Sequence, residues 1–105
     1  MIRLKDNTVS VKGLKPEMVI ALMILRGLFD LYSLPVVVTS GSEGFDGDGV
    51  HMKGSRHYVG EAVDIRKRQV PKDLLPEFIA KMRKFLKSDF EVIDEKHHFH
   101  IETSG

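Results

Sequence analysis

Two short segments alternate strictly between apolar and polar residues, and this pattern constrains the fold more than any other feature of the chain. In residues 98–102 (His-Phe-His-Ile-Glu), phenylalanine and isoleucine fall on one side of a strand, and the polar residues fall on the other. In residues 62–65 (Ala-Val-Asp-Ile), valine and isoleucine would face the core, and alanine and aspartate the opposite side. The sequence therefore predicts strands that bury one face and place acids and histidines on the other.

Apolar spacing predicts two helices. The first begins near Pro16, whose missing N–H costs nothing in a first turn, and runs to about Tyr32. Its apolar residues cover nearly the whole circumference, so we expect it to be buried at the centre of the core. The second runs from about Asp73 to Lys87, with an apolar stripe opposite basic residues and with Pro76 in its first turn.

Three further strands and one long loop complete the predicted elements. The strands are expected at residues 8–11, 36–39 and 90–93. The stretch from Ser40 to Arg56 is rich in Gly, Ser and Asp, and so long a loop in a compact domain is either functional or disordered. Because the loop leads directly into His57, we expect it to form a wall or lid over a site.

Composition limits the class of protein. The chain has 105 residues, of which 42% are hydrophobic, and this predicts one small domain over residues 1–105 with a single core. Because there are no cysteines, disulfides and thiolate metal sites are excluded. The formal net charge of +1 argues against nucleic-acid binding. The longest apolar run, Met18–Leu25, is too short to span a membrane. We expect a monomer, cytoplasmic as synthesised because no secretory signal is visible.

Side chains that commonly bind metals lie on the polar faces of the alternating segments. Asp64 and His100 would face the same way on neighbouring strands, and His57 lies on the loop just before the first of them. Gly60 permits the chain to turn between His57 and Asp64. Zinc in hydrolytic sites takes three His or carboxylate ligands and leaves a position for water. The sequence therefore predicts one zinc ion bound by His57, Asp64 and His100.

Residues beside the third predicted ligand could move protons. Zinc lowers the pKa of bound water to roughly 7, and a nearby base must accept the proton. Glu95 is the first candidate because a carboxylate can accept the proton and pass it to a leaving amine, while Asp94 and His97 are rivals. His98 could stabilise an oxyanion or orient the water, and Glu102, on the same face, could hold a ligand imidazole. A single histidine or aspartate at a strand end is usually structural, so it is the combination that indicates a metal site.

Both segments resemble a known family. The pattern Ser55-x-His57-x-x-Gly60-x-Ala62-x-Asp64-Ile65, followed by His98-x-His100-Ile101-Glu102, resembles the zinc D-alanyl-D-alanine carboxypeptidases. That family shares its fold with the hedgehog signalling domain and with the D-Ala-D-Ala dipeptidases of vancomycin resistance. The resemblance covers roughly residues 35–105 and is closest to short phage and prophage members. The two halves in this order form a specific signal, whereas either half alone would be weak.

The resemblance implies a fold, a site and a substrate. The fold would be α+β, with a small antiparallel sheet packed against two helices and a zinc site on the open sheet face. Zinc would be held at His57, Asp64 and His100, and Ser55 would contact the substrate. The substrate would be a stem peptide of bacterial peptidoglycan, cut at a D-Ala-D-Ala or an L-Ala-D-Glu bond. A phage enzyme of this kind would reach the cell wall through a lysis pore or as part of a virion.

Two departures from the family pattern leave alternatives open. Carboxypeptidases of this type often carry an arginine shortly after Thr-Ser-Gly that binds the substrate carboxylate, but residues 42–44 (Ser-Glu-Gly) contain none. Endopeptidase activity therefore remains open. The family's catalytic acid often lies three residues before the last ligand, where this chain has His97. The alternative function is a zinc-binding interaction module of the same fold with little or no turnover.

Overall fold

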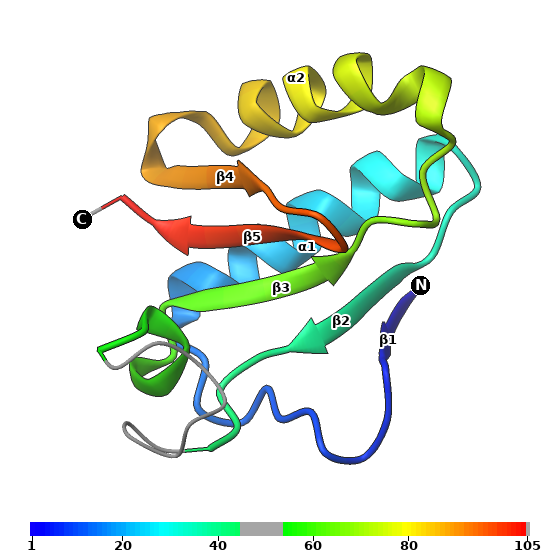
Figure 1. Ribbon diagram of the computed structural model, residues 1–105. Coiled ribbons are helices and arrows are strands. Elements are labelled where there is room, and N and C mark those ends of the chain that lie inside the picture. The colour runs from blue at the N-terminus through cyan, green and yellow to red at the C-terminus, as the bar shows by residue number, and fades with distance from the viewer. Residues whose placement is uncertain (45–53, 105) are drawn as a thin grey trace.

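Five strands and two helices form the protein in a computed structural model that describes residues 1–44 and 54–104 (Figure 1). The strands are β1 (Ile2–Leu4), β2 (Val36–Ser40), β3 (Ala62–Arg66), β4 (Phe90–Asp94) and β5 (His98–Thr103). The α-helices are α1 (Pro16–Leu31) and α2 (Leu75–Leu86), and the short 3-10 helices are η1 (Arg56–Val59), η2 (Lys72–Leu74) and η3 (Lys87–Asp89). The predicted α+β class and both predicted helices are confirmed.

One sheet contains all five strands, in the order β1-β2-β3-β5-β4. β3 is antiparallel to both β2 and β5, and β4 is antiparallel to β5; Asp64 on β3 lies directly opposite His100 on β5. The edge strand β1 instead runs parallel to β2, with Ile2 opposite Val36. The sheet is therefore mixed rather than antiparallel throughout. Because α1 forms the crossover between β1 and β2, the chain can return to the sheet in its original direction.

Residues 8–11 do not form the predicted strand. The backbone N–H of Thr8 donates to the carboxylate of Asp6 at 2.9 Å, which makes a local turn. Farther along, the N–H of Ser10 donates to Glu43 Oε1 at 3.0 Å, and the Ser10 carbonyl accepts from Ser42 N at 2.7 Å. Because these partners satisfy the backbone polar groups, the segment packs as a loop against the end of β2.

Both helices cover one face of the sheet (Figure 1), and the core lies between. The rings of Phe29 on α1 and Phe78 on α2 meet edge to face, with centroids 4.8 Å apart. Phe78 also stacks near Phe99 of β5, at 6.5 Å. As predicted, the phenylalanine and isoleucine of β5 are fully buried, as are Val63 and Ile65 of β3.

The prediction that α1 is buried nearly all round is wrong. Its inner residues are fully or almost fully buried, but Val19, Ile20 and Met23 are about half exposed. Because both helices lie on the same side of the sheet, neither covers the outer side of the other. In the part of the chain that the structure describes, no helix is long and apolar enough to cross a bilayer.

A tight turn connects η1 to β3 and sets where the open face of the sheet begins. Gly60 has a φ of 74°, a left-handed conformation that glycine adopts at little cost. A Cβ at this position would also lie 2.0 Å from the carbonyl oxygen of Gly13. Glycine is therefore required here on two grounds, and the turn holds η1 beside the polar face of β3.

Candidate metal centre

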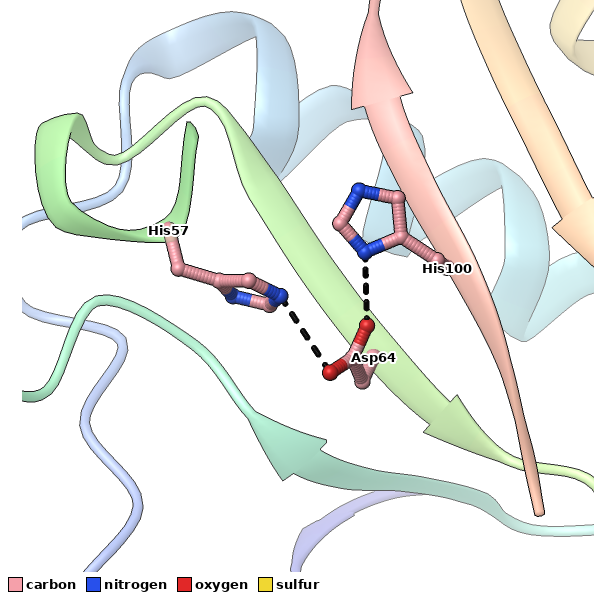
Figure 2. A group of neighbouring side chains, drawn as sticks. All are labelled: His57, Asp64 and His100. Carbon is pink, nitrogen blue, oxygen red and sulfur yellow. Dashed lines mark hydrogen bonds and ion pairs between the residues drawn. The ribbon is translucent and has the colours of Figure 1, made fainter. Parts of the chain in front are cut away.

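Asp64 is the centre of a cluster formed by the three predicted zinc ligands (Figure 2). Its Oδ1 lies 2.9 Å from Nδ1 of His100, and its Oδ2 lies 3.2 Å from Nε2 of His57. One ligand atom from each of the three residues lies within 4.8 Å of the other two. The structure therefore brings together residues from η1, β3 and β5 that are up to 43 positions apart in the chain, since 100 − 57 = 43.

The position of His57 follows from its local backbone. Ser55 caps η1, and its Oγ accepts from the N–H of His57 at 3.2 Å. The ring nitrogen Nδ1 of His57 lies 2.8 Å from the carbonyl oxygen of Gly41. Because a carbonyl can only accept, a hydrogen lies on Nδ1, so a neutral ring would carry its lone pair on Nε2, the nitrogen nearer Asp64. This is the tautomer that a metal ligand bound through Nε2 requires.

Gly41 allows that carbonyl to lie where it does. A Cβ at Gly41 would stand 2.1 Å from the carbonyl oxygen of Ser10, so a side chain would push the two segments apart. Glu43 fixes the same corner, because its carboxylate accepts hydrogen bonds from the backbone N–H groups of Ser10 and Gly41. Sequence reasoning did not identify these two positioning roles; the glycine in Thr-Ser-Gly is the signal that was present.

Two carboxylates hold the ring of His100. Nδ1 faces Asp64, and Nε2 lies 2.8 Å from Oε1 of Glu102. The hydrogen bond to Asp64 raises the pKa of His100 to about 9, against the opposing effect of burial and with help from Glu102. Burial would raise the pKa of Asp64, but the hydrogen bonds from His100 and His57 outweigh it and hold that pKa well below its usual range. In the metal-free protein, His100 is therefore a cation between two anions.

The metal-free protein is expected to lose stability as the pH rises above neutrality. The folded-state pKa of His100 lies above the ordinary histidine value of 6.5, so its proton stabilises the fold fully below pH 6.5, and the contribution is lost as the pH rises through about 9. The contribution of Asp64 changes with pH in the opposite direction. Because its pKa is lowered by folding, its charge stabilises the fold above pH 3.8, and this stability is lost in acid. Urea unfolding with a chelator present, between about pH 5.5 and 9, measures this slope.

The variant His100→Gln is the control for this slope. It removes the titrating ring but keeps a side chain that can hydrogen-bond, so its stability should vary much less over the same pH range. A wild-type stability that rises between pH 6.5 and 9 would contradict the assigned charge state.

The cluster has the chemistry of a divalent metal site. Two imidazole nitrogens and one carboxylate oxygen form a donor set that suits zinc and related ions, and three protein ligands leave a coordination position open. The three side chains are largely shielded from solvent, which favours a defined geometry over a loose surface cluster. The residues therefore fit the metal that the sequence predicted, and the group can hold such an ion.

Glu95 and His98 lie at the edge of this centre. Nε2 of His98 is 2.8 Å from Oε1 of Glu95 and 3.6 Å from Oδ2 of Asp64. The side chain of Glu95 is 46% exposed, so it can meet a molecule arriving from solvent. The structure thus places two of the three predicted catalytic residues beside the predicted ligands.

His97 is not part of this group. It lines a separate hollow of about 220 Å³ together with Lys67, Arg68 and Lys96. Asp94, the other alternative to Glu95 as the base, forms an ion pair with Lys67. His97 lies in the bend between β4 and β5, and His98 is the first residue of β5. Of the candidate bases, Glu95 is therefore the one that the described structure brings to the site.

A hollow of about 310 Å³ opens beside the centre. Its lining includes Ser55, the predicted substrate-binding residue, as well as Glu95 and His100. Arg56 and Ile93 complete much of its wall. A larger hollow of about 480 Å³ contains none of the predicted site residues.

Part of the predicted loop over the site lies outside the described residues. This covers residues 45–53, so the prediction of a wall or lid stays a prediction. Comparisons with family models, with curated proteins and with solved structures gave no match. The case for a function therefore rests on the geometry of the centre and on the two sequence segments that form it.

Proposed function

We propose that this protein is a zinc-dependent peptidase acting on the stem peptides of bacterial peptidoglycan. The supporting observation is the convergence of His57, Asp64 and His100 on one point, with the Glu95–His98 pair beside them. Metal-assisted hydrolysis needs this combination, namely a ligand set with an open position and a base that is accessible from it. A binding site that served only to stabilise the fold would not need the second pair.

Each residue has a role in this proposal. His57, Asp64 and His100 would hold the zinc ion, which would supply Lewis-acid chemistry for activating water and polarising a peptide carbonyl. Glu95 accepts a proton during attack and returns it to the leaving amine. His98 holds the Glu95 carboxylate through their 2.8 Å contact, which orients it toward the centre. Ser55 lies in the wall of the adjoining hollow, where a hydroxyl can hydrogen-bond a peptide backbone.

The substrate class rests on the resemblance of the two segments to the zinc D-alanyl-D-alanine carboxypeptidases. The bond that is cut remains open between D-Ala-D-Ala and L-Ala-D-Glu, because residues 42–44 carry no arginine for a terminal carboxylate. The neighbouring hollow, at about 310 Å³, is of a size that accommodates a small ligand segment rather than a folded partner.

A zinc-binding interaction module is the second candidate. The observation that favours it is the position of His97, which takes the place of the family's usual acid and lines a different hollow. In this reading the ion stabilises the fold by mass action and no peptide is cleaved. The centre and its ligands would be the same, so binding data alone do not separate the two functions.

Digestion of purified peptidoglycan separates them. We expect the zinc-loaded protein to release shortened stem peptides, and mass spectrometry of the resulting muropeptides identifies the bond. The same protein with excess chelator is the control and should release none. A protein that binds zinc tightly but leaves both bonds intact in peptidoglycan of several chemotypes would contradict the peptidase and support the interaction module.

A further inference from the structure

Glu102 joins the ring of one predicted ligand to the element that carries another. Its Oε1 lies 2.8 Å from Nε2 of His100, and its Oε2 lies 3.1 Å from Nε of Arg56. Arg56 is the first residue of η1 and directly precedes His57. One carboxylate thus connects β5 to η1, across an interval of 46 residues, since 102 − 56 = 46.

Arg56 is itself held from more than one side. Its Nη1 donates to Oγ1 of the buried Thr103 at 3.3 Å and lies 3.9 Å from Oε2 of Glu61. The side chain of Glu102 is only 19% exposed. An isolated surface ion pair contributes little, but a partly buried pair inside a network holds its geometry better. The orientation of the Glu102 carboxylate is therefore defined by the protein.

We propose that Glu102 and Arg56 act as a clamp that selects the nitrogen of His100 available to the metal. A neutral imidazole has one N–H and one lone pair, and a carboxylate can only accept. Nδ1 faces the Asp64 carboxylate, and a metal bound there would replace the Nδ1 proton. The N–H that remains is then on Nε2, where Glu102 accepts it. The inference rests on the proposed metal centre, and both residues are positioning residues rather than catalytic ones.

His57 is positioned in the same way, by an acceptor on the ring nitrogen that faces away from the centre. The Gly41 carbonyl accepts from Nδ1 of His57 and leaves Nε2 for the metal. The two rings therefore use opposite nitrogens, and each far nitrogen has its own acceptor. Acceptors of this kind commonly change metal affinity by 10-fold to 100-fold when they are removed (order of magnitude). Arg56 adds a second function, because its positive charge offsets the repulsion between Glu102 and Glu61.

Zinc affinity tests the clamp without reference to catalysis. Competition with a chromophoric chelator should show Glu102→Ala binding zinc roughly 10-fold to 100-fold more weakly than the wild type. Glu102→Gln should lose less zinc affinity than Glu102→Ala, because the amide oxygen of glutamine can still accept the hydrogen bond from Nε2. Arg56→Gln should also weaken binding, and Arg56→Lys should not restore it fully, since lysine lacks the planar fork. Glu77→Gln and Arg68→Gln change exposed charges outside the cluster and should bind zinc like the wild type.

Nitrogen-15 NMR of the imidazoles gives a readout that a purely structural role would not move. In the zinc-loaded wild type, the hydrogen bond to Glu102 should protect the Nε2–H of His100 from exchange with solvent, and in Glu102→Ala this protection should be lost. Circular dichroism of the metal-free variants checks that they fold, and Glu102→Gln serves if Glu102→Ala does not. Unchanged zinc affinity and unchanged protection of the His100 Nε2–H in a folded Glu102 variant would overturn the clamp.

The outcomes distinguish the clamp from the proposed function. A wild-type protein that binds no zinc would overturn the metal centre and the clamp together. Zinc binding that depends on Glu102, without release of any muropeptide, would support the clamp and overturn the peptidase. Zinc-dependent cleavage and zinc affinity that do not change when Glu102 or Arg56 is replaced would support the peptidase and overturn the clamp.

Discussion

Replacing Asp64 with asparagine should abolish the stabilisation that zinc gives to the wild-type protein. Zinc at a free concentration of about 100 times its Kd stabilises a folded site by about 2.7 kcal/mol, and this gain should disappear in the variant. Asparagine has nearly the same shape, but it lacks the charge that neutralises the ion and that contacts both ligand histidines. Thermal melting with zinc and with chelator measures the effect.

Asp94→Asn is the matched control for this experiment. Asp94 lies at the end of β4 and pairs with Lys67, so its loss removes one carboxylate of the same type close to the cluster but outside it. Zinc should raise the melting temperature of this variant as it does that of the wild type. A zinc-induced shift that survives in Asp64→Asn would show that the ion binds elsewhere.

Replacing Glu95 with glutamine should lower kcat for peptidoglycan by a factor of about 10² to 10⁴, the usual contribution of a general acid or base. Glu95 belongs to a second group of possible ligands, with Asp64 and His98, but not to the group formed by His57, Asp64 and His100. With the ion bound by the latter group, zinc affinity should stay close to that of the wild type. The rate of muropeptide release and a parallel zinc titration measure both quantities on the same preparation.

The variant His97→Gln tests the rival base under the same conditions. Because His97 lines a hollow away from the centre, we expect its replacement to change kcat little. His98→Gln should have an intermediate effect, since it removes the group that orients Glu95 but leaves the carboxylate in place. If His97→Gln lowered kcat as much as Glu95→Gln, the assignment of Glu95 as the base would be wrong.

The local pattern of residues was sufficient to predict most of the secondary structure. The alternation at residues 62–65 and 98–102 correctly gave the face of each strand, because the side-chain period of a strand is two. The segment 8–11 has the same period but forms a loop, because the carboxylates of Asp6 and Glu43 offer its backbone other partners. The predicted burial of α1 failed for a different reason, since apolar composition does not show which neighbours a helix has.

By itself, the sequence determined the residue types of the candidate centre and the face that each presents. His57, Asp64 and His100 could be named because ligand chemistry and strand period are local properties. The strand period also placed Glu102 on the face of the ligand rings, but tertiary structure decided the rest: the Gly41 carbonyl as the partner of His57, and Arg56 as the residue that holds Glu102 against His100. Tertiary structure also placed Glu95 beside the centre and His97 in a different hollow. These contacts depend on strand register and on the path of η1, which involve residues far apart in the chain and leave no periodic signal in it.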